Sequence, residues 1–294
     1  MSASLVDFAP AKVNLTLRVL GRRADNYHEL ESLVAFAAYG DGISFMPGGE
    51  LALTVKGPNA AAAGVGADNL VLKAARALAE RVPGLGLGAF TLDKRLPVAA
   101  GLGGGSADAA AALRLLARSN GLATGDARLH EAARSTGADV PVCLDPRPRL
   151  MRGIGEVLSP PLDLPALPAV LVNPGIAVST KAVFAGWTPS ARAMPLEVPA
   201  AKIGREQLLR LLLRGANDLE GAAIALMPAI ADLLAALRAL PGARLARMSG
   251  SGATCFALFS SAAAAIAGGK IATGQFPRWW VRATALKGGE TATA

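Results

Sequence analysis

The clearest alternation of apolar and polar residues lies at positions 12–19, which read KVNLTLRV. Every second residue from Val13 to Val19 is apolar, and polar residues stand between them. Because successive side chains of a strand point to opposite faces, this pattern predicts a strand with one buried face. Lys12 and Asn14 would project together from the other face, and we interpret Arg18 as an ordinary solvated residue of that face.

Apolar runs bounded by turn residues predict further strands, and apolar residues at helical spacing predict helices. The expected strands are residues 42–45, 51–55, 89–93, 169–173, 179–187, 244–248, 254–260 and 280–285. The expected helices are residues 69–80, with Asp68 as the cap, 107–119, 126–135, 205–213, 216–226, 228–240 and one between the last two strands.

Strands and helices mix in both halves of the chain, and prolines become frequent between positions 141 and 168. This organisation predicts two α+β domains, residues 1–160 and 161–294, with a cleft between them. We expect the last residues, 288–294, to be disordered.

A glycine-rich stretch at 97–112 reads PVAAGLGGGSADAAAA and lies between a predicted strand and a predicted helix. Glycine lets the backbone come close to a ligand, and the free N–H groups at a helix start favour a phosphate. The stretch lacks the Gly-Lys-Ser/Thr ending of a Walker A loop and the acidic residue of a dinucleotide fingerprint. A flexible turn is the alternative, but a turn needs fewer glycines, so we favour an anion-binding loop. Ser106 would cap the helix or contact a phosphate or its metal.

Three other positions are open on pattern alone. Asp139 stands between a predicted helix end and an extended Val-Pro segment, where it is either a turn residue or a catalytic group. The basic loop 21–29 is either a plain hairpin loop or a binding loop, in which Tyr27 offers a stacking face and His28 a hydrogen-bonding ring. A second glycine turn at 249–253 reads as a hairpin of little specificity.

The composition narrows the class of protein. The chain of 294 residues has a formal net charge of +8 and a pI of about 10.0, but its arginines are scattered and aromatic residues make up only 4%. These features are typical of solvated surfaces and permit a polyanionic small substrate. The two cysteines, Cys143 and Cys255, lie far apart in apolar runs, and there are only two histidines. We therefore expect no zinc site and two buried free thiols.

One segment, 248–269, carries no charge and is long enough to span a bilayer. It opens with Ser-Gly-Ser-Gly and closes with alanines and glycines, which favours a loop, a buried strand and an alanine-rich helix instead. No signal peptide is visible at the N-terminus. These features predict a soluble cytoplasmic protein.

Three segments together resemble the motifs of the GHMP kinases, a superfamily that includes galactokinase, homoserine kinase and mevalonate kinase. They are residues 10–15 (PAKVNL), 97–110 and 248–253, and the resemblance covers nearly the whole chain in order and spacing. It implies an N-terminal half like domain 2 of ribosomal protein S5 and a ferredoxin-like C-terminal half. It also implies ATP as the phosphoryl donor, with Mg²⁺.

Residues 23–30 (RADNYHEL), 101–106 (GLGGGS) and 137–141 (GADVP) are similar to one branch of this superfamily. That branch phosphorylates the 2-hydroxyl of a methylerythritol joined to cytidine diphosphate, in the non-mevalonate route to isoprenoids. The resemblance implies Lys12 and Asp139 as the catalytic pair. It places Tyr27, His28 and Phe184 around the cytosine, and Asn14 and Thr180 near the erythritol hydroxyls.

The same resemblance implies a nucleotide site along the glycine-rich stretch. Its expected members are Pro97, Val98, Ala99, Ala100, Gly101, Leu102, Gly103, Gly104, Gly105, Ser106 and Ala107, with Asn69 and Lys94 near the adenosine. Ala107-Asp108 replaces a Ser-Asn pair that is frequent in the family. We expect Asp108 to point away from phosphate or to help hold Mg²⁺, because a carboxylate facing the phosphates would repel them.

Two other functions compete with this one. Another GHMP kinase, of the mevalonate or homoserine type, would not need Tyr27, His28 and Phe184. A non-catalytic nucleic-acid-binding protein with an S5-like fold agrees with the high pI but has no use for Lys12, the glycine loop and Asp139 together. We therefore expect a small-molecule substrate, no nucleic acid, no membrane partner, and a monomer or homodimer.

Overall fold

The computed structural model describes residues 4–25, 27–189 and 202–287. Its strands are β1 (Leu5–Asn14), β2 (Arg18–Arg22), β3 (His28–Pro47), β4 (Ala52–Lys56), β5 (Gly88–Asp93), β6 (Arg149–Gly153), β7 (Val157–Leu158), β8 (Leu167–Asn173), β9 (Ala243–Met248), β10 (Cys255–Phe259) and β11 (Trp280–Lys287). Its helices are α1 (Ala60–Ala63), α2 (Leu70–Arg81), α3 (Gly104–Ser119), α4 (Ala127–Thr136), α5 (Val140–Leu144), α6 (Thr180–Ala185), α7 (Arg205–Arg214), α8 (Glu220–Leu226), α9 (Ala229–Ala239) and α10 (Ala262–Gln275).

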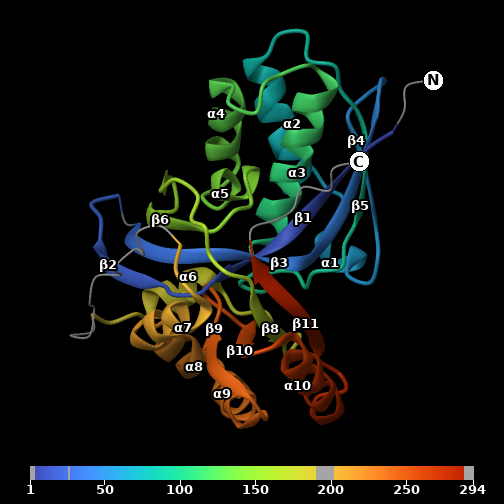
Figure 1. Cartoon of the computed structure of the whole chain (residues 1–294). Coiled ribbons are helices and arrows are strands. Elements are labelled where there is room, and N and C mark those ends of the chain that lie inside the picture. Colours follow the sequence, from blue (N-terminus) through green and yellow to red (C-terminus); the bar gives the residue numbers. More distant parts are fainter. Residues whose placement is uncertain (1–3, 26, 190–201, 288–294) are drawn as a thin grey trace.

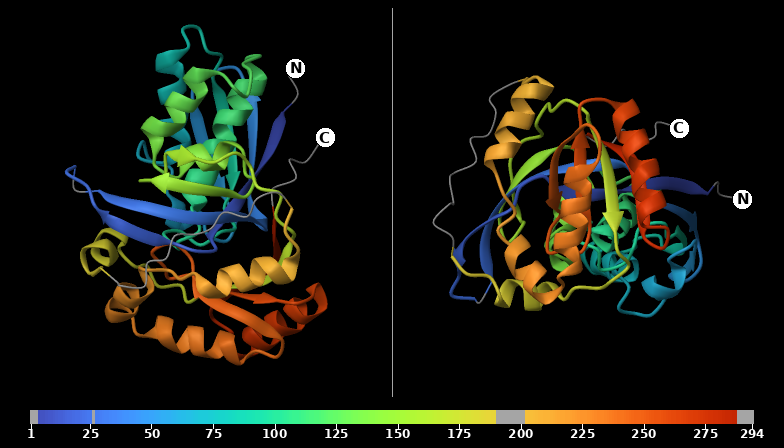
Figure 2. Two further views of the ribbon diagram at one scale, coloured as in Figure 1. Left: turned by 60° about the vertical axis from the view of Figure 1, so that its left-hand side comes forward. Right: turned by 90° about the horizontal axis from the view of Figure 1, so that it is seen from below.

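All strands of the described residues join one mixed sheet, whose main path runs β4-β5-β3-β11-β8-β10-β9. The long strand β3 pairs with β1, β2, β5 and β6. Helices α2, α3 and α4 gather on one side of β3, and α8, α9 and α10 lie beyond its other side (Figure 1). Seen from below, α9 and α10 lie across the C-terminal strands, with which they make most of their contacts (Figure 2).

The last strand connects the two halves. β11 pairs with β8 from Trp280 to Leu286, and its end also pairs with β3 through Leu286↔Ala37 and Lys287↔Phe36. The proline-rich stretch contains β6, which pairs with β3 and so belongs to the N-terminal half up to that point. The division into 1–160 and 161–294 stays a prediction.

The strand expected at 12–19 is interrupted, because β1 ends at Asn14 and β2 begins at Arg18. The apolar face is buried as expected, but Lys12 and Asn14 are only 4% and 3% exposed. The solvated interpretation of Arg18 is wrong, since its guanidinium donates to Glu31 at 2.8 Å and both side chains are largely buried. Other elements cover the polar face of this strand.

Most other predicted elements are confirmed within a few residues, with four corrections. The segment 179–187 contains helix α6, capped by the Ser179 hydroxyl, and is not a strand. Asn69, not Asp68, caps α2, because its side chain accepts from the Val71 N–H at 3.0 Å. The segment after Asp139 is helix α5, not an extended run. The short helix α1 is not among the helices predicted from the sequence.

The glycine-rich stretch leads into a helix that is almost wholly inside the protein. α3 packs on β1, β3 and α2, and its alanines from 109 to 112 have no exposed surface. Small side chains allow this close approach, which fixes the start of the helix relative to the sheet. Both cysteines are free and buried, as expected.

Among the described residues, no helix is long and apolar enough to cross a membrane. Segment 248–269 forms the end of β9, a turn, β10 and part of α10, as its sequence predicts. The expected disordered tail, 288–294, lies outside the described residues.

Candidate active site

The glycine loop closes directly onto the start of α3. The helix begins at Gly104, three residues before the predicted start, and Gly103 precedes it in the left-handed conformation with φ +59°. A Cβ at Gly103 would lie 3.2 Å from Lys12 Cε. Ser106 is the third residue of this helix, and Gly103 holds the cap position before it. The loop therefore brings the N-terminus of a 16-residue helix next to Lys12.

The second glycine turn supports the first. The Ser249 hydroxyl accepts from the Asn14 N–H at 3.1 Å and donates to the Gly101 carbonyl at 2.9 Å. The Thr254 N–H donates to the Ala100 carbonyl at 3.1 Å. Gly250 and Ser251 line the same cavity as the glycine loop. The residue pattern of this turn, 249–253, predicts only a hairpin. Its resemblance to a GHMP motif is the signal in the sequence that indicates a part in the site.

Lys12 and Asp139 form an ion pair at the edge of the loop. Lys12 Nζ lies 2.9 Å from Asp139 Oδ1, and the Lys12 side chain is 5% exposed whereas that of Asp139 is 34% exposed. The Lys12 N–H donates to the Leu102 carbonyl at 2.9 Å, which ties β1 to the glycine loop. Asp139 immediately precedes α5 and lies opposite Gly103. The carboxylate therefore faces the cavity while the ammonium group lies behind it.

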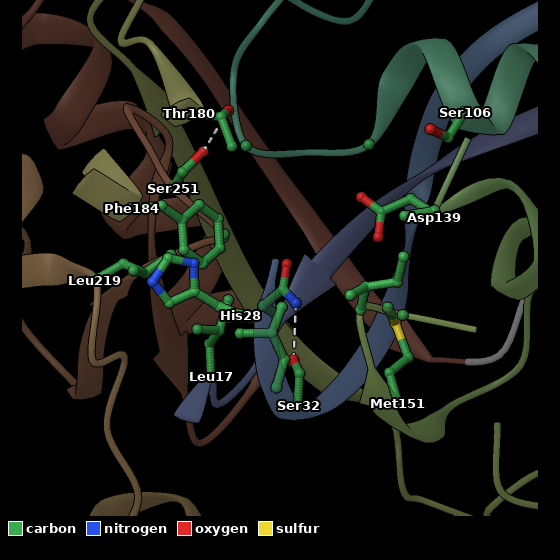
Figure 3. Close-up of a pocket in the computed structure, with 18 of the residues that line it drawn as sticks. Leu17, His28, Ser32, Ser106, Asp139, Met151, Thr180, Phe184, Leu219 and Ser251 are labelled. Atoms are coloured by element: carbon green, nitrogen blue, oxygen red, sulfur yellow. Dashed lines mark hydrogen bonds between the residues drawn. The ribbon is translucent and has the colours of Figure 1, made fainter. Parts of the chain in front are cut away.

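A cavity of about 1110 Å³ connects these groups with an aromatic cluster. Figure 3 shows His28 and Phe184 at one end and Asp139 and Ser106 at the other. The predicted site residues that line it are Lys12, Asn14, Tyr27, His28, Ala99, Ala100, Gly101, Gly103, Gly104, Gly105, Ser106, Asp139, Thr180 and Phe184.

At the aromatic end, His28 stacks on Phe184 with ring centroids 5.0 Å apart. Trp187, which the sequence analysis did not single out, meets the His28 ring edge-on at 5.7 Å. Burial, and then the positive charge of Arg22, lower the pKa of His28 below its ordinary value, so the neutral ring is favoured. Tyr27 is 60% exposed at the rim.

Polar groups also line the cavity. The Thr180 and Ser251 hydroxyl oxygens are 2.8 Å apart. The side-chain amide of Asn14 donates to the Ser32 hydroxyl at 2.7 Å, while its buried Oδ1 has no hydrogen-bond partner among the described residues. A buried acceptor without a partner is costly unless a ligand hydroxyl reaches it.

Six residues of the expected nucleotide site do not line the cavity: Asn69, Lys94, Pro97, Val98, Leu102 and Ala107. Leu102 and Ala107 point into the core, at 1% and 0% exposure. The Asn69 amide donates to the Gly64 carbonyl at 2.9 Å. Their side chains are thus occupied elsewhere, and their expected place along the nucleotide stays a prediction.

Lys94, expected near the adenosine, directs its side chain toward two carboxylates, and its nearness to the nucleotide stays a prediction. Its ammonium group is buried and bonded to Asp41 at 2.6 Å and to Asp108 at 2.5 Å. Two carboxylates outweigh the effect of burial and raise the pKa of Lys94. Lys94 Nζ lies 3.2 Å from the position of a Cβ at Gly104, so the cluster supports the glycine loop from behind.

Asp108 points away from the cavity, which agrees with the first of its two expected placements, away from the phosphates. Burial raises the pKa of its carboxyl to about 8, with Lys94 opposing the rise and Asp41 adding to it. Because this carboxyl is bonded to Lys94 and lies inside the protein, it is not placed to hold Mg²⁺ in the cavity.

Comparisons with known proteins agree with this geometry. The family models for the GHMP kinases N terminal domain and the GHMP kinases C terminal match residues 69–145 and 198–273. A 4-diphosphocytidyl-2-C-methyl-D-erythritol kinase of Rhodopseudomonas palustris (strain HaA2) is 54% identical, over 97% of this chain and 99% of its own. Another protein of that name, from Xanthobacter autotrophicus, is 58% identical over 95% and 98% of the two chains.

Solved structures give the same result. A crystal structure of 4-(cytidine 5'-diphospho)-2C-methyl-D-erythritol kinase matches with a TM-score of 0.79 and 36% identity, over 97% of this chain and 100% of that one. A homoserine kinase from Cytophaga hutchinsonii, 21% identical with a TM-score of 0.72, shares the fold over 98% of this chain and 96% of its own.

A glycine loop at a helix start, a lysine–aspartate pair beside it and a two-part α+β fold define a small-molecule kinase of the GHMP class. Within that class, the chain belongs to the family of the 4-diphosphocytidyl-2-C-methyl-D-erythritol kinases.

Proposed function

We propose that this enzyme transfers the γ-phosphoryl group of ATP to the 2-hydroxyl of 4-diphosphocytidyl-2-C-methyl-D-erythritol, in the non-mevalonate route to isoprenoids. The observation that carries the proposal is one cavity with the Lys12–Asp139 pair at its phosphate-binding end and the His28–Phe184 stack at the other. The first end suits phosphoryl transfer, and the second suits a planar base. The reaction would take place in the cytoplasm, where ATP is supplied, and a monomer or homodimer stays a prediction.

In this mechanism Asp139 accepts the proton of the attacking hydroxyl. Lys12, 2.9 Å away and buried, keeps the carboxylate ionised and orients it. The glycines at 101 and 103–105, with Ser106, offer backbone N–H groups and a helix N-terminus to the ATP phosphates. Phosphoryl transfer depends mainly on such positioning and charge stabilisation, so these groups supply what the chemistry needs.

A Mg²⁺ ion bound with ATP would supply charge neutralisation for the phosphoryl transfer. It needs few protein oxygens, because phosphates and water provide the rest of its coordination. This suits the site, where the described residues contain no cluster of three or more metal-ligating side chains. The Ser106 hydroxyl and the Asp139 carboxylate, both on the cavity wall, are the groups that would contact the ion.

The cytosine would stack on Phe184, with Tyr27 on its other side. In the present structure the His28 ring stacks on Phe184 with ring centroids 5.0 Å apart, so it would lie next to the bound base. A neutral His28 can both donate to and accept from the edge of the base. Asn14 Oδ1 and Thr180 would then receive the erythritol hydroxyls nearer Asp139.

The test is ADP release from Mg-ATP with 4-diphosphocytidyl-2-C-methyl-D-erythritol, mevalonate, homoserine or no acceptor. We expect release only with the cytidine substrate. Release with another alcohol would retain Lys12, Asp139 and the glycine loop but overturn the roles given to Tyr27, His28 and Phe184. Absence of release with every acceptor, from folded protein that binds ATP, would overturn the proposed function.

A further inference from the structure

Two positively charged side chains of the cavity, Arg22 and Lys181, are not used by the mechanism above. Arg22 ends β2, and Lys181 is the second residue of α6. We propose that Lys181 and Arg22 bind the diphosphate group that joins the two parts of the substrate. This inference rests on the proposed function and adds an anion subsite to it.

The charges of the cavity wall do not cancel. Besides Arg22 and Lys181, its charged members are Lys12, Asp25 and Asp139. Lys12 pairs with Asp139, and Asp25 accepts from Arg23 at 3.2 Å and from the Tyr27 N–H at 3.1 Å. Neither Arg22 nor Lys181 forms an ion pair within the described residues. Three cations and two carboxylates therefore line the cavity, and this net positive charge has the sign that attracts a diphosphate.

The position of these cations along the cavity also fits. Lys181 and Phe184 are three residues apart on α6 and share one side of that helix, which faces the cavity. Thr180, the neighbour of Lys181, points toward Ser251 above Phe184 (Figure 3). Arg22 is close enough to His28 to lower its pKa.

The substrate has the same order as the cavity. Its cytosine and ribose come first, the diphosphate follows, and the erythritol carries the hydroxyl that is phosphorylated. With the base on Phe184 and the hydroxyl at Asp139, the diphosphate must cross the intervening stretch. Lys181 and Arg22 line the cavity and form no ion pair within the described residues, and charge-assisted hydrogen bonds to phosphate are stronger than neutral ones.

The experiment compares the binding of CDP and cytidine to the full-length enzyme by calorimetry, with saturating ADP present to occupy the glycine loop. The variants are Lys181→Met and Arg22→Met, which keep much of the apolar length, and Lys181→Arg, which keeps the charge. Lys270→Met, an exposed lysine on α10 that does not line the cavity, is the matched control.

We expect each Met variant at positions 181 and 22 to weaken CDP binding about tenfold, as expected for the loss of one charged hydrogen bond. Cytidine affinity and the KM for ATP should stay within about twofold of wild type. Lys181→Arg should keep most of the CDP affinity, and the salt dependence of CDP binding should decrease in the Met variants. In turnover, KM for the cytidine substrate should rise with little change in kcat.

Equal CDP affinity in Lys181→Met, Arg22→Met and Lys270→Met would overturn the diphosphate subsite, as would an equal weakening of CDP and cytidine. A wild-type enzyme that binds ATP but neither cytidine nor CDP would instead overturn the proposed function, and the subsite with it. The two failures are therefore distinguishable.

Discussion

Asp108 is a carboxyl group buried behind the phosphate-binding loop, and its proton makes stability depend on pH. Its pKa rises from 3.8 to about 8 on folding, so between these values the folded protein holds a proton that the unfolded chain releases. Stability therefore falls as pH rises through this window, by up to about 1.4 kcal/mol per pH unit.

Asp108→Asn removes this proton while keeping the shape of the side chain, and Asp41 still pairs with Lys94. We expect the variant to lose less stability than wild type between pH 6 and pH 8. Urea unfolding at these two pH values measures the difference. Asp163→Asn, at an exposed loop position, is the control and should keep the wild-type slope. A wild-type slope in Asp108→Asn would show that this carboxyl does not hold the proton.

Asp139 is the second carboxylate for which we predict the effect of a substitution, in this case on kcat. Asp139→Asn leaves a hydrogen-bonding group beside Lys12 but no proton acceptor, so kcat should fall about 10²- to 10⁴-fold. KM for ATP should change less than about threefold, because the glycine loop is intact. Steady-state kinetics, with Asp163→Asn as the control, measure both parameters. Turnover within a few-fold of wild type would remove Asp139 from the proton-accepting role.

Residue patterns predict which side chains share a face of a strand, but they predict the burial of those side chains poorly. The period-two pattern correctly placed Lys12 and Asn14 on one face, but it could not show that the face is covered. The covering groups come from distant segments: Leu102 and Gly103 of the glycine loop and Ser249 near the end of the chain. Local periodicity carries no information about such partners.

At the scale of elements, the glycine loop at Gly101 contacts the second glycine turn, residues 249–253. A methyl group added at Gly101 should disrupt this contact. Gly101 and Gly121 both have positive φ, +74° and +65°. A Cβ at Gly101 would lie 2.4 Å from the Ser249 carbonyl oxygen, whereas nothing lies within 4 Å of one at Gly121. Gly121→Ala therefore measures the backbone strain alone, on the order of 1 kcal/mol.

We expect Gly101→Ala to lower the melting temperature more than Gly121→Ala and also to raise KM for ATP, because the loop must shift away from Ser249. Gly121→Ala should leave KM unchanged. Thermal unfolding and initial rates give both readouts. Identical effects of the two substitutions would mean that the contact between the turns does not shape the nucleotide site.

The sequence predicted the order of elements well and their ends less well. α3 starts three residues before its predicted start, at Gly104 and Gly105, which are poor helix formers on their own. An added Cβ at either glycine would meet Leu96 or Leu70, so apolar neighbours from other segments surround this turn. Segment 179–187 is rich in residues that strands also use, and only the Ser179 cap marks it as a helix. Tertiary contacts decided both cases.

For the whole molecule, the shared sheet predicts one cooperative unfolding transition. All three tryptophans, Trp187, Trp279 and Trp280, lie in the C-terminal half, so fluorescence follows that half, while far-UV circular dichroism follows both. We expect the two signals to give the same urea midpoint, because β11 joins β8 to β3. A separate fluorescence midpoint would show that the halves unfold independently and that the pairing of β11 with β3 adds little.

Among the described strands, β11 is the last to be synthesised, yet it lies in the middle of the sheet. At about 5–20 residues per second, translation of the chain between β8 and β11 takes roughly 5–20 s. Throughout this time the edge of β8, a strand buried along its whole length in the finished protein, has no partner on the β11 side. Unpaired apolar edges favour aggregation, so the yield of active enzyme in a cell should depend on how quickly the ribosome passes this interval and on the chaperones that cover it.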